Sequence, residues 1–506
     1  MNAYKINWVI QMLTISDEEL VNRMRFDNPW WGSGAIPQDV SAYPERDYFA
    51  PFLDLVRERQ LRRAVVLMGP RRVGKTIMMQ QAIKHLLAAG ADKQNLLFIS
   101  LDTPLFSGLP LEKLLQVYLG SYGGAPGDRT IFFDEIQYLK DWEVHLKSLV
   151  DSYRDIKFVV SGSAAAALSR GSRESGAGRF TEFLLPPLTF AEFLRLTGHP
   201  LATVMGETDL IDRIGELNAA FVDYLNYGGY PELALSEEAK RNPARYIGQD
   251  IVEKVLLRDL PSLYGISDVQ ELQHLFKVLA FNTGQEVSLE GLSKSSRVAK
   301  NTLRRYIEYL EAAFLVRTVE RIDINAQRFQ RNHYFKVYLT NPCLRAALFG
   351  PVRADDDIMG AMVETAIFAQ WFHDAKAKDH LRYARDKEGE IDIVSVQFGE
   401  PAWIVEIKWT DRFFERPGDL GYLRKFAAKH ARSLNWPAPS PNIVITTKQK
   451  TGDISFDIVP MHFEPAAYYC LKVGRNAADA AAQQVEFDLL PPAAPGEDDG
   501  QEELPF

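Results

Sequence analysis

The residues best suited to chemistry stand at 69–76, where GPRRVGKT directly follows the apolar run AVVLM. Gly69, four further residues and then Gly74-Lys75-Thr76 satisfy the pattern G-x4-G-K-[ST]. Glycines let successive backbone N–H groups turn toward an anion, and the dipole of a helix that begins here favours phosphate. A glycine-rich turn without a ligand is the weaker alternative, because chance produces this pattern in about one such chain in fifty.

The contacts expected at this turn follow from phosphate chemistry. Lys75 is expected to reach the β- and γ-phosphates, and Thr76 to ligate Mg²⁺. The strand TIFFDE ends in two acids, so Asp134 is the expected second partner of the metal and Glu135 the group that polarises the attacking water. The expected ligands are therefore ATP and Mg²⁺, and the predicted nucleotide-binding run comprises Gly69, Pro70, Arg71, Arg72, Val73, Gly74, Lys75, Thr76 and Ile77.

Two further kinds of polar residue follow along the chain. The strand IKFVVSGS ends with Ser161 and Ser163, either of which could sense the γ-phosphate; an ordinary strand-ending turn is nearly as good an interpretation. Downstream come Arg170, Arg173 and Arg179, and Arg179, after two glycines, is the favoured arginine finger. The alternative is a solvated arginine side chain.

A second group of ionisable residues lies near the C-terminus. The run GEIDIV places Asp392 on a strand, and WIVEIKW places Glu406 and Lys408 on one face of the next strand. Two carboxylates on adjacent strands can bind Mg²⁺, and a lysine beside them can activate water at a phosphodiester. The alternative is a structural Glu–Lys pair on an exposed strand.

The elements that position these residues alternate between strands and helices. Between 61 and 195, four short apolar runs (AVVLMG, NLLFISLD, TIFFDE and IKFVVSGS) alternate with helical patterns, which predicts an α/β fold with a parallel sheet. The other segments are an irregular N-terminal arm that packs its two tryptophans on the next domain (1–60), a helical segment (196–262), a helix-rich block (263–325), a mixed α/β region (326–475) and an acidic, disordered tail (476–506).

Within the helix-rich block, RVAKNTLRRYIEYLEAAFLV has an apolar face at helical spacing and a basic face outside it. A short helix, a turn and this basic helix form a helix-turn-helix pattern, which suits contacts to DNA phosphates. A structural helical unit with a solvated basic face explains the pattern equally well. The basic residues are Lys294, Arg297, Lys300, Arg304 and Arg305.

Several of these motifs together resemble a known family. GPRRVGKT, FFDEIQ, the run VVSGSAAAALSRGSRESGAGRFTEFLLPPLTFAEFL and YGGYPE are similar to prokaryotic AAA-like ATPases of the AAA_14 type, near the STAND and archaeal ATPases. Those proteins end in a DUF4143 domain of PD-(D/E)xK nuclease-like fold. Over residues 60–465 the resemblance implies a P-loop NTPase parallel sheet with a helical subdomain, a winged-helix-like module and a C-terminal α/β restriction-endonuclease-like domain.

The resemblance also implies roles for individual residues. Gly229 and Pro231 would lie near the adenine with Tyr230 between them, and Glu364 would join Asp392 and Glu406 as a metal ligand. One departure is Asn341-Pro342-Cys343, where the family tends to read D-x-G; it puts a supporting polar contact in doubt.

Composition limits the classes of function. The 506 residues carry a net charge of −9, which excludes a wholly basic nucleic-acid coat but allows a basic patch. The two cysteines fit reduced thiols, and the absence of a leader peptide or a long apolar stretch predicts a cytoplasmic protein without membrane contact.

The predicted function is an Mg²⁺-dependent ATPase that couples nucleotide state to a DNA-binding, nuclease-like domain. The alternative is an ATP-dependent switch or signalling ATPase that acts on a protein partner, or on copies of itself, through a catalytically silent C-terminal domain.

Overall fold

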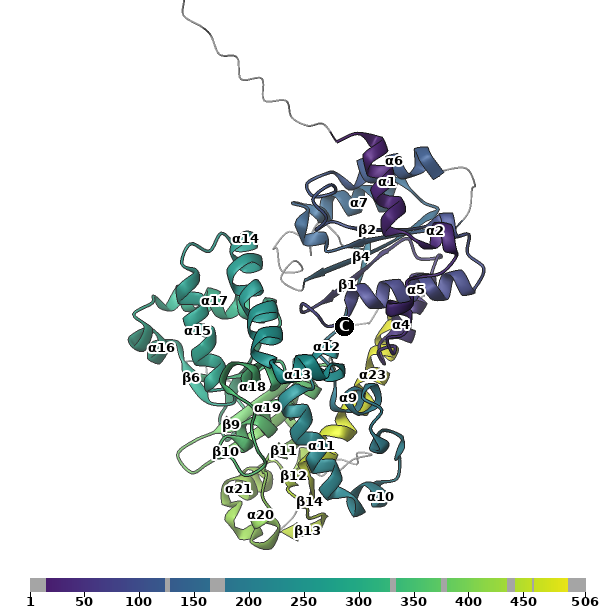
Figure 1. Ribbon diagram of the computed structural model, residues 1–506. Helices are drawn as coiled ribbons and strands as arrows, with labels where there is room; N and C mark the ends of the chain where they lie inside the picture. Colours follow the sequence, from purple (N-terminus) through teal and green to yellow (C-terminus); the bar gives the residue numbers. More distant parts are fainter. Residues whose placement is uncertain are drawn as a thin grey trace, which may run out of the picture.

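The computed structural model describes residues 15–122, 128–163, 178–327, 334–374, 380–434, 442–456 and 459–489. Figure 1 shows three lobes: one around a five-stranded sheet, one formed by helices α14–α17, and one around a nine-stranded sheet. No helix in the described ranges is long and apolar enough to cross a bilayer.

The five-stranded sheet is parallel, with strand order β2-β3-β4-β1-β5. Four of its strands were predicted; β5 was not. Because β4 lies between β1 and β3, the carboxyl ends of these three strands meet at one edge. The strands are β1 (Ala64–Gly69), β2 (Leu96–Ser100), β3 (Arg129–Asp134), β4 (Ile156–Ser163) and β5 (Phe180–Leu184), and the helices beside them are α5 (Lys75–Ala88), α6 (Leu111–Tyr122) and α7 (Trp142–Ser152), with the short turns η1 (Lys93–Asn95) and η2 (Ile136–Tyr138).

The N-terminal segment belongs to this lobe. The irregular arm expected there is wrong, because four helices lie between residues 17 and 57, but the predicted packing of the tryptophans is confirmed. Trp30 and Trp31 are buried, and both indole N–H groups donate to the Leu96 carbonyl, at 3.0 and 2.9 Å. The helices are α1 (Asp17–Asp27), α2 (Trp30–Ser33), α3 (Gln38–Ser41) and α4 (Phe49–Arg57).

A chain of helices leads away from the sheet toward the second lobe. It includes two segments with wider, π-type hydrogen bonding, η5 (Ala244–Glu253) and η6 (Val255–Asp259), which run into α14 (Leu260–Tyr264). The elements before them are α9 (Phe190–Leu196), η4 (Pro200–Thr203), α10 (Glu207–Asp212), α11 (Ile214–Tyr227), α12 (Pro231–Leu235) and α13 (Glu237–Arg241).

The expected helix-turn-helix pair is present in the second lobe. It consists of α16 (Leu289–Ser296) and α17 (Lys300–Ala312), preceded by α15 (Val269–Phe281). Strands β6 (Glu286–Ser288), β7 (Val316–Ile322) and β8 (Tyr334–Leu339) form an antiparallel sheet in the order β7-β8-β6 beside these helices.

This small sheet continues into the C-terminal region. Strand β7 pairs in parallel with β9, so the order is β13-β14-β12-β11-β10-β9-β7-β8-β6, and the expected boundary at 325/326 falls inside one continuous sheet. The remaining strands are β9 (Leu381–Arg385), β10 (Glu390–Gln397), β11 (Glu400–Glu406), β12 (Ile443–Thr447), β13 (Gly452–Phe456) and β14 (Val459–Pro465). The helices of this region are α18 (Cys343–Phe349), α19 (Met359–Trp371), α20 (Arg412–Glu415), η8 (Pro417–Asp419), α21 (Gly421–Lys429) and α22 (Ala431–Leu434).

The chain returns toward the first lobe at its end. Helix α23 (Ala466–Leu489) packs along α19, α9 and α4, as the long yellow helix in Figure 1 shows. The disordered tail expected from 476 is therefore wrong as far as Leu489, and residues 490–506 lie outside the described ranges. Cys343 and Cys470 are buried, free thiols.

Candidate nucleotide site and a carboxylate–lysine cluster

The turn between β1 and α5 has the backbone of an anion cradle. Gly74 has a φ of 99° and Arg72 a φ of 62°, so the chain enters the left-handed region twice before α5 begins. A Cβ on Gly69 would stand 2.2 Å from the Leu185 carbonyl oxygen, so this position requires glycine. From the N-terminal segment, buried Arg46 donates to the Val73 carbonyl at 2.9 Å and supports the turn from behind.

The charged side chains of the turn meet the ends of the neighbouring strands. The Lys75 ammonium donates to the carbonyls of Gly69 and Pro70, at 3.0 and 2.9 Å. Thr76 Oγ1 donates to Asp134 Oδ2 at 2.7 Å, and Ser161 donates to the other oxygen of the same carboxylate. The predicted partners Thr76 and Asp134 are thus in contact, and Ser161, one of two candidate sensors, is the serine that joins them.

The residues present fit a magnesium nucleotide. Burial lowers the pKa of Lys75, whereas burial, reinforced by Glu135, raises the pKa of Asp134 to about 6. A buried ammonium is stabilised by an anion and a buried carboxylate by a cation, and phosphates with Mg²⁺ supply both. Ser163, which pairs with Gly69 in the strand register, has a buried hydroxyl oxygen without a partner in the described part of the chain. That oxygen offers one more polar group at the mouth of the turn.

Glu135 follows the strand in a conformation unusual for a residue with a side chain. Its φ is 56°, its backbone N–H donates to Ser161 Oγ at 3.3 Å, and Gln137 donates to its carboxylate. The carboxylate therefore stands beside the Asp134 end of the strand without being part of the Thr76 and Ser161 network. This placement suits a group that acts on a water molecule rather than on the metal.

The two arginines inside the turn contact the helices that lead to the second lobe. Arg71 makes a two-point ion pair with Asp259 at the end of η6, at 2.5 and 2.8 Å, and Arg72 pairs with Glu232 on α12 and with Asp250 on η5 at 3.1 Å. The Asp259 pair raises the pKa of Arg71. Sequence reasoning missed these partners because they are distant in the chain. Glu232 lies 160 residues after Arg72, and Asp259 lies 188 residues after Arg71.

The structure corrects the expected arginine finger. Arg179 immediately precedes β5, and its carbonyl accepts from the N–H of Ala64 at the start of β1, so it lies at the opposite edge of the sheet from the phosphate turn. Its guanidinium pairs with Asp151 at 2.8 Å. The expectation that it serves this chain's own nucleotide site is therefore wrong, and Arg170 and Arg173 lie outside the described residues.

The YGGYPE element leads into α12, one of the helices that carry the acidic partners of the two arginines. A Cβ on Gly229 would stand 2.5 Å from Asn341 Cγ and 2.7 Å from Cys343 Sγ, so this glycine allows close packing. Pro231 is the first residue of α12, whose next residue, Glu232, is the partner of Arg72. The adenine contact of Pro231 stays a prediction. Asn341 stands where the family pattern led us to doubt a polar contact, yet its side chain makes two. Its amide oxygen accepts from the Cys343 N–H, and its amide nitrogen donates to the Tyr224 hydroxyl.

Near the C-terminus, three of the predicted residues meet. Asp392 on β10 lies opposite Glu406 at the end of β11, and the Lys408 ammonium contacts Glu406 at 2.6 Å and Asp392 at 3.5 Å. Burial, reinforced by Asp392, raises the pKa of Glu406 to about 7, and its second oxygen is buried without a partner in the described part of the chain.

The fourth predicted residue is held by a lysine that sequence reasoning missed. Glu364 on α19 accepts from Lys336 at 2.7 Å and from the Tyr338 hydroxyl at 2.5 Å. Lys336, with its side chain 3% exposed, also contacts Glu390 and lies 3.5 Å from Asp392. Across the described ranges no three histidine, cysteine or carboxylate side chains form a group that could hold a metal. Glu364 and the Asp392–Glu406 pair are thus joined through a lysine, and their metal role stays a prediction.

Comparison with protein families identifies part of the chain. Residues 61–194 match the family model described as an AAA domain, and residues 218–355 match a domain of unknown function, DUF8612. The first match covers the phosphate turn, Asp134 and Glu135, so this part of the chain is similar to an AAA domain. The resemblance to DUF4143 proteins is not confirmed, because the second match is to DUF8612.

Relatives are distant and share much of the chain. An uncharacterized protein of Haemophilus influenzae is 26% identical over 296 residues, 56% of this chain and 69% of the relative. An uncharacterized protein of Methanocaldococcus jannaschii is 24% identical over 418 residues, 78% of this chain and 82% of the relative. The structure of the Aeropyrum pernix ORC2 protein with ADPNP and ADP covers 66% of this chain and 96% of that one, at 14% identity and a TM-score of 0.35.

Proposed function

We propose that this protein hydrolyses ATP at the P-loop. The observation that carries the proposal is that a turn shaped for phosphate holds a buried Lys75 ammonium, while its Thr76 hydroxyl contacts the buried Asp134 carboxylate. Lys75 would move from the two carbonyls that now accept it to the β- and γ-phosphates. Bound Mg²⁺ would be held by Thr76 and Asp134 and would offset charge on the phosphates. Glu135 would orient and deprotonate the attacking water.

The test separates binding from turnover. Lys75→Ala should abolish ATP binding measured by calorimetry, and Glu135→Gln should keep binding while reducing kcat by about 100-fold or more. Lys84→Ala is the matched control, because Lys84 is an exposed lysine on the same helix. Unchanged turnover in the Lys75 variant would refute the proposal.

Nucleotide state would be coupled to the second lobe through the P-loop arginines. Arg71 holds Asp259, α14 follows directly, and Tyr264 on α14 stacks on Tyr309 of α17 at 4.1 Å. The Tyr309 hydroxyl in turn accepts from Arg305 on the exposed side of α17. These contacts support a continuous series of interactions from the P-loop to α17. A phosphate that competes for Arg71 would weaken the first of them, the ion pair between Arg71 and Asp259.

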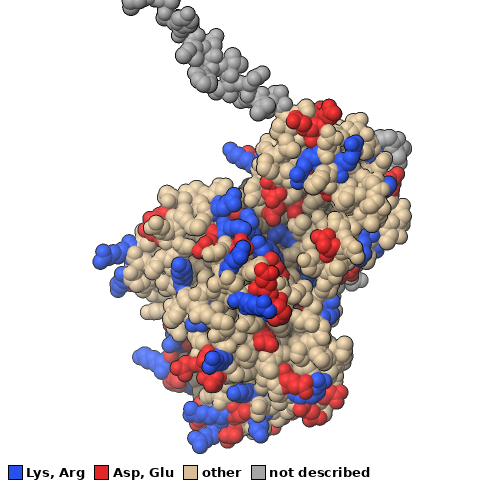
Figure 2. Space-filling view, viewed as in Figure 1, with Lys and Arg blue, Asp and Glu red and all other residues tan. Residues whose placement is uncertain are grey.

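The surface that this connection reaches would bind DNA. The helix pair and the three strands beside it have the element order of a winged helix, and the five predicted basic residues of α16 and α17 are all exposed. Figure 2 shows further basic side chains over the η5–α14 segment, beside the groove that faces the P-loop lobe. Arg304→Ala should weaken binding of duplex DNA in fluorescence anisotropy and lower its salt dependence, whereas Lys277→Ala on α15 should not.

Metal-dependent cleavage of that DNA is a second candidate, favoured by the unpartnered buried oxygen of Glu406. Incubation with duplex, branched and single-stranded DNA and Mg²⁺ or Mn²⁺ tests it, and cleavage should disappear in Asp392→Ala and in Lys408→Ala. Its absence in every case would favour the alternative, in which the lysine-neutralised cluster is structural and the C-terminal region contacts a protein partner.

A further inference from the structure

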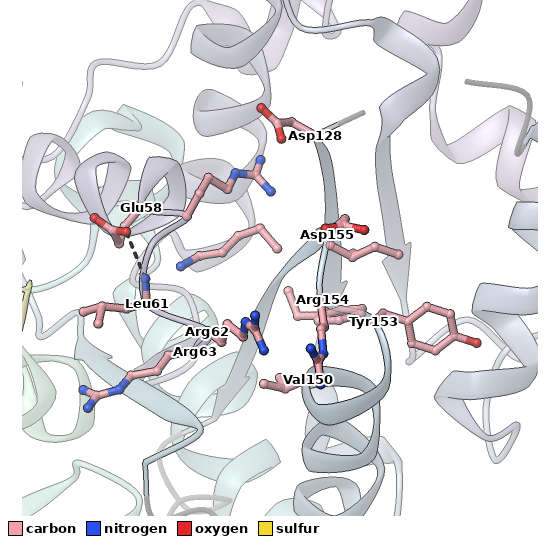
Figure 3. A pocket seen from close by; sticks show the side chains of 13 residues that line it. Glu58, Leu61, Arg62, Arg63, Asp128, Val150, Tyr153, Arg154 and Asp155 are labelled. Atoms are coloured by element: carbon pink, nitrogen blue, oxygen red, sulfur yellow. Dashed lines mark hydrogen bonds between the residues drawn. The ribbon is translucent and has the colours of Figure 1, made fainter. Parts of the chain in front are cut away.

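A second basic cavity lies on the P-loop domain, at the edge of the sheet opposite the phosphate turn. It is about 150 Å³ in volume and is surrounded by the loop before β1, the residue before β3 and the turn from α7 into β4 (Figure 3). Strand β1 is six residues long, which separates the two sites by on the order of 15 Å. The nucleotide function does not use this cavity.

Cations outnumber acids around the cavity, and most of them lack partners. Five arginine and lysine side chains line it against three acids. One arginine, Arg59, donates to the Arg129 carbonyl and to Thr130. The other four have no hydrogen-bond or ion-pair partner for their side chains among the residues that the structure describes. They are Arg62, Arg63, Arg154 and Lys157.

None of the three acids forms a hydrogen bond or an ion pair with these four cations among the described residues, although the charge of Glu58 acts on Lys157 from a distance. The Glu58 carboxylate accepts from the backbone N–H groups of Gln60 and Leu61, as the dashed line in Figure 3 shows for one of them. Figure 3 also shows Asp128 at one end of the cavity and Arg62 and Arg154 toward the other, with Asp155 between them. Around Arg62 and Arg154, like charges therefore gather without an ion-pair partner among the residues that the structure describes.

Lys157 is the most constrained of the four. The residue is 6% exposed, and burial, with a smaller contribution from the positive charge of Arg59, lowers the pKa of its amine to about 8. An amine of this kind is costly to keep buried unless an anion accompanies it. Lys157 lines the same cavity as the unpaired arginines, and both residue types bind phosphate through charge-assisted hydrogen bonds.

We propose that this cavity binds a small anion through one or two phosphate groups, separately from the P-loop. Its volume of about 150 Å³ is below the roughly 300 Å³ at which pockets for drug-sized ligands begin, which suits phosphate or pyrophosphate rather than a complete nucleotide. The ligand can be a free phosphate compound or the phosphate end of a larger metabolite that extends into solvent. Arg62 and Arg154 contact it from the solvent side, and Lys157 contacts it from the sheet.

The test uses pyrophosphate as the probe, on the full-length Lys75→Ala protein with EDTA present, so that neither the P-loop nor a metal contributes. Calorimetry should detect one binding event that weakens as the salt concentration rises, and pyrophosphate should raise the melting temperature. Arg62→Ala and Arg154→Ala should each weaken binding about tenfold. Both residues are exposed, so these variants should fold, and Lys84→Ala, at an exposed lysine on α5 outside the cavity, is the control.

Separate arms distinguish the sources. Tighter binding of a phosphorylated metabolite such as a sugar phosphate than of pyrophosphate, lost in Arg154→Ala, assigns the phosphate end of a larger ligand. The proposal is overturned if pyrophosphate does not bind below millimolar concentration or binds equally well to both arginine variants. It is also overturned if duplex DNA, but not pyrophosphate, binds in a manner that depends on Arg62 and Arg154.

Discussion

The ion pair between Arg71 and Asp259 should set how strongly the P-loop is connected to the second lobe. The pair has two contacts, at 2.5 and 2.8 Å, and the side chains are only 19% and 9% exposed. Exposed pairs contribute below about 1 kcal/mol, and breaking a fully buried pair costs about 3–5 kcal/mol. We therefore expect a coupling energy of about 2 kcal/mol, because this pair is largely but not completely buried.

Asp259→Asn keeps the shape of the side chain and removes its charge. The free energy of unfolding should fall by about 2 kcal/mol, and ATP should bind up to tenfold more tightly, because Arg71 no longer has a carboxylate to exchange for phosphate. A double-mutant cycle uses the two single variants, Asp259→Asn and Arg71→Gln, and the double variant. Each is measured by urea unfolding and by ATP calorimetry.

Asp250→Asn is the matched control, because Asp250 and its partner Arg72 are 25% and 33% exposed and their nitrogen–oxygen distance is 3.1 Å. Its coupling energy should stay below about 1 kcal/mol. A coupling energy for Arg71 and Asp259 below about 0.5 kcal/mol, together with unchanged ATP affinity, would refute the proposed exchange.

Three other substitutions, and a fourth that serves as a control, test the packing and the electrostatics. At pH 7 the charged amine of Lys157, with a pKa of about 8 instead of 10.5, should destabilise the ligand-free fold by about 3 kcal/mol. Lys157→Met should restore that amount in urea unfolding, with a gain that shrinks as the pH rises from 8 to 10.5; a constant gain contradicts the reasoning. Gly229→Ala should cost about 1–3 kcal/mol of unfolding free energy, since its Cβ would lie 2.5 Å from Asn341 Cγ; an unchanged melting temperature would be contrary to this. Lys336→Met should cost about 3–5 kcal/mol because three carboxylates lose their cation, whereas Lys425→Met at an exposed pair should cost under about 1 kcal/mol. Recovery of the Lys336 variant on adding Mg²⁺ would show that the cluster accepts a divalent cation, and equal losses for the two lysines would refute the burial argument.

The sequence alone was enough for the contacts that depend on local pattern. The phosphate turn is one short run whose glycines, lysine and threonine act within eight residues, so its conformation follows from local backbone preferences. Asp134 could be assigned to the same site because parallel strands bring their carboxyl ends to one edge. The strand runs around Asp392 and Glu406 predicted two carboxylates close together for a different reason, because residues on adjacent strands can lie opposite each other; here the strands, β10 and β11, are antiparallel.

Tertiary structure decided the contacts between segments far apart in the sequence. Whether Arg179 lies near the phosphates depends on the direction in which β5 runs in the sheet. The residues around Arg179 in the sequence do not reveal that direction. Arg71 acquired a role only when η6 brought Asp259 to it from 188 residues away. In the sequence, Lys336 is one residue of a mostly apolar strand. In the structure it lies at the centre of a carboxylate cluster, because β8, α19 and β10 meet there. Charges interact through distance and burial, which a linear sequence does not contain, whereas a turn is determined by its own residues.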